Sequence, residues 1–435
     1  MRTMRFAGIL GIGLLFILSV LPRPPAVSAD VAPGDVIDKT NWQKAEGLLP
    51  DPVLNWVRRG DFILNIAELA YDPKEFITPA YKQSLEDNVG KYALNEEDVI
   101  IDAETGEAPG FIVGIPFPGV DLSDPRAGTK LMHNRGYYWA QKGNASVRNE
   151  AIWVGQGGYE REISNELMIL YLDGYPAARS YRNPDAFLKK SVIAVDYPYD
   201  VSGFSILSWR YRDKRADVTV AYVPAIRRVR RMSPANRSDS FLGSDFCVDD
   251  PNGYDGKVEL VTWKVIGERE TLVPFRDTKP QRMVENERGE LVTTSDIAPL
   301  VHGYEAEGWQ GAPWALVSTV WAKRNLILIE GVAKDPYYNY GKMIIWYDEE
   351  FHIPKYKVIH DRAGDYWKTM IVSNGGYETP DKTGLYMSPD IHLVVDDRTR
   401  HASLIRGASE KNIWRYKVDL DLADFTLAGF QKYCK

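Results

Sequence analysis

The sequence is poor in the residues that build metal centres and covalent cross-links. Its 435 residues include only two cysteines and six scattered histidines. Neither their number nor their spacing fits a zinc site, which needs three or four such ligands at short intervals. We therefore expect no metal and no cofactor. In an oxidising compartment, Cys247 and Cys434 can form a disulfide or stay separate as buried thiols, and the sequence leaves both alternatives open.

The signatures of common enzyme classes are also missing. The chain has no G-x-S-x-G elbow, no H-E-x-x-H and no phosphate-binding loop. The segment DDPNGYDG (249–256) holds three aspartates but lacks the alternating ligands and distal glutamate of a calcium loop, so we interpret it as a turn. A catalytic carboxylate pair among Glu349, Asp361 and Asp365 would require the fold to bring them together. We do not expect the protein to be an enzyme.

Long apolar runs are absent except at the start of the chain. A basic stretch, MRTMRF, precedes the apolar AGILGIGLLFILSVL, and Val27 and Ala29 follow at positions −3 and −1 of a cleavage site. This pattern predicts a signal peptide over residues 1–29, cleaved after Ala29, and the apolar run is too short for a membrane span. Cleavage removes three arginines and no acid, so the formal net charge changes from −7 to −10. Export separates the protein from nucleic acid.

Residues 30–144 carry the start and stop signals of short amphipathic helices. Asp51, followed by proline, opens a helix that Gly60 ends. Thr78 and Asp124, each also followed by proline, open two more helices with apolar residues at helical spacing. The stretch GFIVGIPFPGVDLSDP is rich in glycine and proline and is typical of an extended connector. We expect this helical and extended region to pack on the remainder of the chain.

Apolar residues recur at every second position over residues 145–435, which is typical of strands with one buried face. In GFSILSWRYR, Leu207, Trp209 and Tyr211 lie on one face and polar residues on the other. The segment WRYKVDLDL (414–422) alternates in the same way. No strand–helix–strand repetition occurs. The sequence predicts a mainly β protein with a large antiparallel sheet, which forms one large domain with the N-terminal region.

A wide sheet with an aromatic-rich face and a few short helices has two physical uses. The helices can simply cover the core, or sheet and helices can stand apart and enclose an apolar cavity for a lipid-like ligand. We expect the apolar faces of the strands to turn inward. The candidate ligand-binding residues of such a cavity are Leu207, Trp209, Tyr211, Val220, Tyr222, Trp263 and Trp346.

Four arginines lie close together in the segment YVPAIRRVRRM, namely Arg227, Arg228, Arg230 and Arg231. They fall on both faces of one short predicted strand, so neither face is a conventional core. The pattern is typical of a sheet edge protected by charge. It also suits a surface that docks on an anionic membrane or on an acidic partner. A role in nucleic-acid binding does not agree with export.

Several longer segments resemble one protein family. They include GIPFPGVDLSDPRAGTKLMHN, VAYVPAIRRVRRM, GSDFCVDDPNGYDGK and MIIWYDEEFHIPKYKVIHDRAGDYWK, and they keep their order over most of the chain. The family comprises exported proteobacterial proteins of unknown function that are often described as outer-membrane lipoprotein-sorting proteins. It resembles in turn the periplasmic carriers of the LolA and LolB type.

This resemblance implies a strongly curved, half-open antiparallel β-barrel with short amphipathic helices across its concave face and an apolar cavity. It implies a non-enzymatic periplasmic carrier of a lipid or other hydrophobic molecule between the inner and outer membranes. It also implies an outer-membrane protein and a resistance-nodulation-division type transporter as neighbours. From the residues themselves, two alternatives stay open: an envelope hydrolase or polar-ligand binding subunit, and a structural envelope protein.

Overall fold

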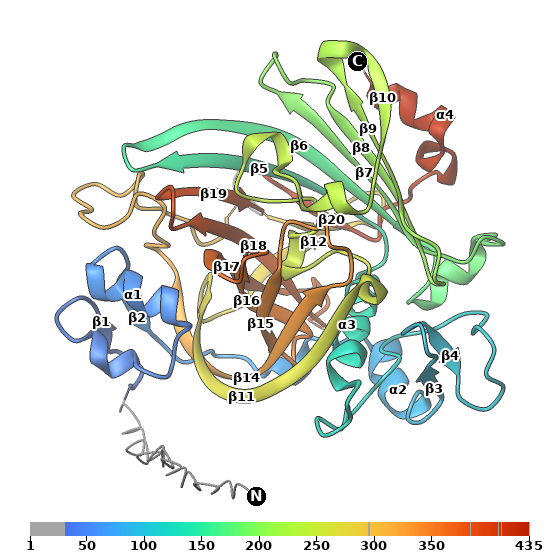
Figure 1. The fold of residues 1–435 in the computed structure, drawn as a ribbon, viewed down its shortest axis with the longest axis horizontal. Helices are drawn as coiled ribbons and strands as arrows, with labels where there is room; N and C mark the ends of the chain where they lie inside the picture. The colour runs from blue at the N-terminus through green and yellow to red at the C-terminus, as the bar shows by residue number, and fades with distance from the viewer. Residues whose placement is uncertain (1–30, 295, 383, 408, 410, 435) are drawn as a thin grey trace, which may run out of the picture.

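The computed structural model describes residues 31–434 except 295, 383, 408 and 410, so the predicted signal peptide lies outside the described residues. The fold is mainly β, as the alternation predicted, and one sheet contains eighteen of the described strands. The sheet is strongly curved and closes on itself in places, without forming a regular barrel (Figure 1). None of the helices in this part of the chain is long and apolar enough to cross a membrane.

One part of the sheet is an arm of six strands that pair antiparallel in sequence order. Hairpin-length connections join most of them, as expected for strands with alternating polarity. The strands are β5 (Ala145–Gly155), β6 (Gly158–Tyr171), β7 (Phe187–Tyr197), β8 (Ser205–Tyr211), β9 (Val218–Val223) and β10 (Arg228–Met232).

The remaining strands of the sheet join the arm where β19 and β20 pair with β5. Most pairings are antiparallel, as predicted, and β2–β14, β11–β17 and β12–β17 add short parallel contacts. The strands are β11 (Val261–Phe275), β12 (Gln281–Glu285), β13 (Leu291–Thr293), β14 (Val320–Ala333), β15 (Lys342–Asp348), β16 (Ile353–His360), β17 (Tyr366–Glu378), β18 (Leu385–Asp396), β19 (His401–Arg406) and β20 (Trp414–Tyr416).

The N-terminal region forms the three predicted helices. They are α1 (Asp51–Arg59), α2 (Pro79–Asp87) and α3 (Ala127–Tyr138). Gly60 ends α1 in the left-handed conformation, at φ 83°, and the Thr78 side chain caps α2 by accepting the Tyr81 N–H. Short strands β1 (Val36–Ile37) and β2 (Leu64–Ile66) join the large sheet, whereas β3 (Tyr92–Leu94) and β4 (Ile100–Asp102) pair with each other.

Helix α3 lies directly on β11. The helix approaches so closely that a Cβ atom at Gly128 would lie 3.0 Å from the backbone of Trp263. Only glycine leaves the space for this contact. The approach fixes the start of α3 on the sheet, and the 3₁₀ turn Trp139–Lys142 connects its end to β5.

The outer face of the arm is covered by the end of the chain. The predicted strand 414–422 stops at Tyr416, because Lys417 adopts a left-handed conformation with φ 58° and turns the chain away. The following C-terminal segment, residues 417–434, carries the short helix α4 (Leu427–Phe430), which lies beside the strands of the arm, on the right in Figure 1. Its side chains pack on the outer residues of β6 to β9, and the Trp209 indole donates to the carbonyl of Phe425 at 2.7 Å.

The inner face of the arm is crossed by the long connection between β10 and β11, residues 233–260, which we call the strap. It is held at the β5 and β19 side by the Trp153 indole, which donates to the Gly243 carbonyl, and by the Ser403 hydroxyl, which donates to Asp245. At the β7 and β8 side, Asp255 anchors it to the sheet. Strap and sheet therefore form two layers that meet at both ends.

Candidate functional site

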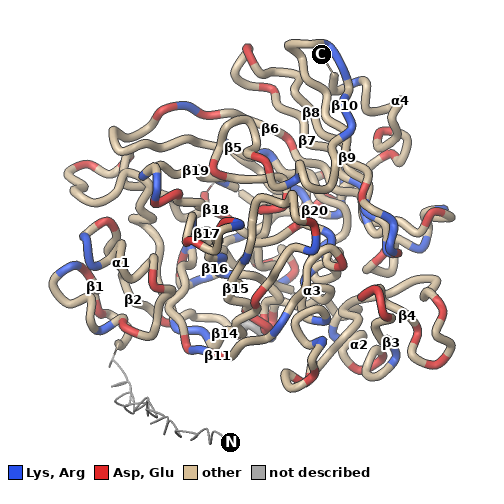
Figure 2. The backbone as a smooth tube through the Cα atoms, in the orientation of Figure 1, with Lys and Arg blue, Asp and Glu red and all other residues tan. Residues whose placement is uncertain are grey.

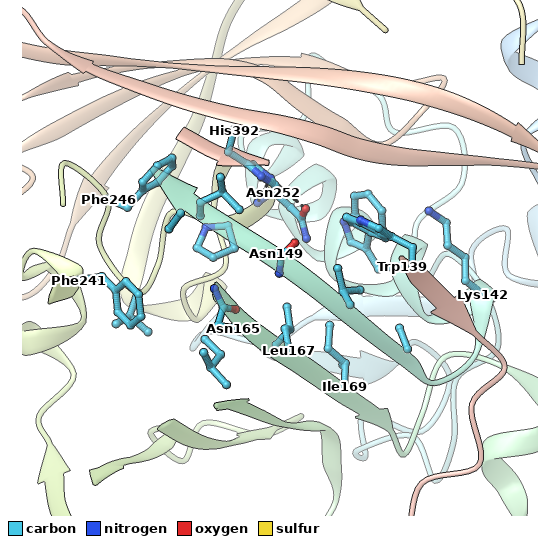
Figure 3. A pocket seen from close by; sticks show the side chains of 18 of the residues that line it. Trp139, Lys142, Asn149, Asn165, Leu167, Ile169, Phe241, Phe246, Asn252 and His392 are labelled. Carbon is cyan, nitrogen blue, oxygen red and sulfur yellow. Dashed lines mark hydrogen bonds between the residues drawn. The ribbon is translucent and has the colours of Figure 1, made fainter. Parts of the chain in front are cut away.

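A cavity of about 1040 Å³, its open mouth included, lies between the inner face of the arm and the strap. Its lining is mostly apolar, as in sites that bind hydrophobic ligands. Figure 3 shows the floor residues projecting from two neighbouring strands, with Trp139 and Lys142 at one end and Phe246, Asn252 and His392 opposite the floor.

The strand register explains the apolar floor. Val147, Leu167, Ile193 and Ile206 face one another across β5, β6, β7 and β8, and they form one row. Ala145 and Ile169 lie in the next row and continue to two serines on β7 and β8. Because side chains alternate across a strand, only every second residue belongs to this floor. Leu167, Ile169 and Ile193 are only half-buried, although the strap lies above them.

Two amides interrupt the apolar floor. Asn149 and Asn165 lie directly opposite each other on β5 and β6, and both side chains line the cavity. They are 8% and 7% exposed. Polar groups of this kind in an apolar pocket fix the orientation of a ligand by hydrogen bonding.

The roof and one end of the cavity are also largely apolar. The strap contributes Phe241, Phe246, Cys247, Val248, Pro251 and Asn252. Trp139, Trp414 and Tyr416 close the end next to the start of β5, and Lys142 lies among them. The Lys142 ammonium is 4.3 Å from the centroid of Trp139 and 5.3 Å from that of Tyr416, and it bonds the Met387 carbonyl. Burial lowers the pKa of Lys142 well below its ordinary value.

The other end of the floor is charged. Tyr171, Lys189 and Arg210 form the row beyond the two serines, on β6, β7 and β8. Asp255 of the strap lies over them, 2.8 Å from the Lys189 ammonium and 3.4 Å from the Arg210 guanidinium. Burial alone would raise the pKa of Asp255, but the surrounding cations hold it below its ordinary value. Burial lowers the pKa of Lys189 to about 8.

A histidine and a cysteine line the cavity, and burial shifts the pKa values of both. Burial lowers the pKa of His392 to about 3, and its Nε2 already accepts the Asn252 N–H at 3.0 Å. Burial raises the pKa of the Cys247 thiol, which disfavours a thiolate nucleophile. Among the described residues, no cluster of three His, Cys, Asp or Glu side chains is suited to hold a metal ion.

The three carboxylates considered in the sequence do not line the cavity. Glu349 lies before β16 and Asp361 after it, so this strand separates them by its full length. Asp361 accepts the backbone N–H groups of Ala363 and Asp365, which shapes the turn into β17. Its side chain also forms an ion pair with Arg398.

None of the seven candidate cavity residues from the sequence lines this cavity. Leu207, Trp209, Tyr211, Val220 and Tyr222 belong to the outer face of β8 and β9 and pack with the C-terminal segment. Trp263 packs edge-on against Tyr254 beneath α3, and Trp346 packs against Tyr356 in the main core. The apolar face of β8 and β9 exists as expected, but the chain itself covers it. The alternate residues of β8, Ile206, Ser208 and Arg210, line an adjoining cavity.

The four arginines lie at an exposed sheet edge. Arg227 is left-handed, with φ 48°, and links the turn Pro224–Ile226 to β10. Arg228, Arg230 and Arg231 belong to β10, which pairs only with β9 among the described strands. Figure 2 shows the basic stretch along this edge. All four side chains are exposed, and none forms an ion pair with a described carboxylate.

The two cysteines do not pair. Cys247 lines the cavity from the strap, whereas Cys434 packs with the cluster on the outer face of the arm, and both are free. The sheet therefore separates the two thiols, and of the two alternatives the structure has separate thiols.

Sequence reasoning missed the floor of the cavity and the role of the strap. One signal for the floor was present: LMILY (167–171) on β6 is apolar on both faces, as expected for a strand buried on both sides. No comparable signal identified the segment 249–256 as more than a turn. Its three aspartates form ion pairs with Arg237, Lys357 and the charged row, and two of them are almost fully buried.

Comparisons with known proteins agree with the resemblance seen in the sequence. A family model described as Protein of unknown function (DUF1329) matches residues 36–430. A domain described as outer membrane lipoprotein-sorting, from Vibrio parahaemolyticus, is 17% identical, with a TM-score of 0.48, over 72% of this chain and 100% of that chain. No curated protein matches the chain.

Two further solved structures are similar at the same level. A DUF1329 family protein from Desulfovibrio piger is 16% identical, with a TM-score of 0.47, over 70% of this chain and 99% of that chain. A LolA superfamily protein from Nitrosomonas europaea is 11% identical, with a TM-score of 0.40, over 69% of this chain and 98% of that chain.

Proposed function

The chain belongs to the family described as Protein of unknown function (DUF1329), and from that premise we propose that it is a non-enzymatic carrier of a lipid or similar hydrophobic molecule. We place its action in the periplasm, between the inner and outer membranes. The apolar cavity under the strap is the observation that carries this proposal.

The half-buried floor gives the physical reason for binding. Leu167, Ile169 and Ile193 retain exposed apolar surface inside a cavity, although they sit in the middle of a sheet. Burying apolar surface contributes about 25 cal/mol per Å². A long apolar ligand would cover these residues, and burial of their apolar surface would stabilise the complex. Without a ligand, this surface stays exposed in the cavity. The aligned rows favour an elongated molecule.

A carrier must also meet the membranes that supply and receive its cargo. We propose that Arg227, Arg228, Arg230 and Arg231 dock the protein on an anionic membrane surface or an acidic partner, such as an outer-membrane protein or a resistance-nodulation-division type transporter. The unpaired charges at the sheet edge support this, because each arginine near an anionic surface can contribute about 1 kcal/mol. Replacing all four by serine should weaken transfer to anionic vesicles and leave ligand affinity unchanged. If the variant and the wild type transfer ligand equally well at low salt, the arginines do not dock the protein and only protect the sheet edge.

Binding of an apolar fluorophore tests the carrier itself. We expect 1-N-phenylnaphthylamine to bind the wild-type protein, and Leu167→Trp to weaken binding by more than about tenfold, since the indole fills the space over the floor. Leu427→Trp is the matched control, because Leu427 is 52% exposed on α4, away from the cavity. Equal binding by both variants would contradict the proposed site.

Native mass spectrometry of protein isolated from its own cell envelope gives an independent test. The wild-type protein should carry an additional apolar mass, which Leu167→Trp reduces. Empty wild-type protein that also fails to bind the fluorophore would contradict the carrier function.

A further inference from the structure

We propose that the ligand is an amphiphile with one anionic head group, which binds at Arg135, Lys189 and Arg210 while its apolar chain lies along the floor of β5 to β7. This inference rests on the proposed function, because it names the chemical class of ligand for the same apolar floor, which continues into an adjoining cavity lined by these three cations. A long-chain carboxylate or a monoalkyl phosphate has the required chemistry.

The polarity of the floor changes in one direction. The row Val147–Leu167–Ile193–Ile206 is wholly apolar, and the next row ends in Ser191 and Ser208. The row after that holds Lys189 and Arg210. Successive rows are about 7 Å apart, because two residues separate them along each strand. An extended molecule on this floor would therefore contact apolar side chains at one end, hydroxyl groups in the middle and cationic side chains at the other end.

The charged end holds more cations than carboxylates. Arg135, Lys189, Arg210 and Arg237 face Asp217, Asp249 and Asp255, which they contact in ion pairs of 2.6 to 3.4 Å. The cluster thus keeps one positive charge in excess. Burying an unbalanced charge is costly, and an anion supplied by a ligand would balance it.

Arg135 has an unused donor in this cluster. The residue is 4% exposed and lines an adjoining cavity from α3. This second cavity shares Leu167, Ile169 and Ile193 with the first. The terminal nitrogens of Arg135 reach Asp255 at 3.3 Å and the Pro251 carbonyl at 3.2 Å, which are long contacts for a guanidinium. Its Nε is buried without a hydrogen-bond partner. A carboxylate or phosphate oxygen would satisfy this donor.

The opposite end of the cavity suits an anion less well. Lys142 is enclosed there by aromatic rings and bonds a backbone carbonyl. Its environment disfavours the charged ammonium. An anionic head group at this end would bind well only if Lys142 were protonated, which its apolar enclosure disfavours. The cluster around Arg135 is already cationic.

Competition with matched ligands tests the inference. Hexadecanoate, monohexadecyl phosphate and hexadecanol are titrated against protein loaded with 1-N-phenylnaphthylamine. We expect at least one of the two anions to bind about tenfold to a hundredfold more tightly than the alcohol, which is typical of hydrogen bonds to a charged group. In Arg135→Gln, this ratio should fall close to one. Arg269→Gln, at an exposed position on β11, makes the same charge change and should keep the wild-type ratio.

Each outcome decides the matter. A wild-type ratio near one, or a high ratio that survives Arg135→Gln, would overturn the inference while leaving a carrier of neutral ligands. Failure of all three ligands to displace the fluorophore would instead contradict the proposed function. Lys189→Gln provides the same test if Arg135→Gln does not fold, as judged by circular dichroism. The phosphate-to-carboxylate ratio identifies which anion the site prefers.

Discussion

The inner and outer faces of β6 to β8 carry apolar side chains of similar size, yet the chain fills the space beside only one of them. On the outer face, Leu170, Val192 and Leu207 are at most 1% exposed beneath the C-terminal segment. On the inner face, Leu167 and Ile193 stay half-buried beneath the strap. An apolar strand face therefore does not by itself mark either a core or a ligand site. The segment that covers it makes the difference.

The two covers are also attached differently. Apolar side chains such as Phe425 and Phe430 attach the C-terminal segment. Ion pairs and hydrogen bonds attach the strap to the sheet at its two ends, including those of Asp245 and Asp255. Apolar contacts close the space they cover, whereas a polar attachment at the two ends of the strap leaves the middle open. This contrast suits a filled core on one side and a loading site on the other.

Truncation of the outer cover should have the largest effect on stability. Phe430 is completely buried against the arm. We expect Phe430→Ala to lower the free energy of unfolding by about 3 to 5 kcal/mol, measured by urea denaturation, because it creates a cavity in a filled core. The affinity of the folded variant for 1-N-phenylnaphthylamine should stay within about threefold of the wild type, a change of less than 1.4 kcal/mol. If Phe430→Ala unfolds with the same free energy as the wild type, the C-terminal segment does not form a filled core with the outer face.

A matched pair of leucines sharpens the comparison. Leu207→Ala should cost about 2 to 5 kcal/mol of unfolding free energy, as for other buried leucines. Leu167→Ala should cost about 1 kcal/mol, because its side chain is already partly exposed in the cavity. Fluorophore affinity should change in the opposite order, with the larger loss in Leu167→Ala. Equal effects on both properties would remove the distinction between the faces.

The smallest effect concerns the pH dependence of the strap. His401 contacts Asp245 of the strap at 2.7 Å, and this hydrogen bond raises the pKa of His401 in the folded state. The resulting stabilisation is complete below the unfolded-state pKa of about 6.5 and is lost as the pH rises through the raised folded-state pKa. Because His401 is partly exposed, we expect less than about 1 kcal/mol.

The variant His401→Gln isolates this contact. It should flatten the slope of unfolding free energy against pH between about pH 6 and pH 8, where an ordinary or moderately raised histidine titrates. A slope equal to that of the wild type would mean that other groups control the pH dependence of the strap.

Local signals in the sequence predicted the local structure well. The prolines after Asp51 and Thr78 and the glycine at Gly60 identified helix termini, because capping depends on a few adjacent residues. Alternation identified β8 and the start of β20 for the same reason. The premature end of β20 depends on the backbone conformation of Lys417, which alternation does not encode.

Contacts between distant segments could not be predicted in this way. The choice between the two faces of β8 depends on the C-terminal segment, more than 200 residues away in the chain at the Trp209–Phe425 contact. The partners of Asp255 come from α3, β7 and β8. Such an ion pair forms only when the folded chain brings opposite charges together. The spacing of residues in a single sequence does not indicate which distant charges will meet.

Photocrosslinking of a bound ligand tests the central claim most directly. The wild-type protein is loaded with a diazirine-labelled alkyl carboxylate, irradiated and digested, and the modified peptides are identified by mass spectrometry. We predict labels on the inner face and its roof, in peptides that contain Val147, Leu167 or Phe246. Labels concentrated on peptides that contain Leu207, Trp209 or Phe430 would show that the ligand enters the outer face, and would contradict the account.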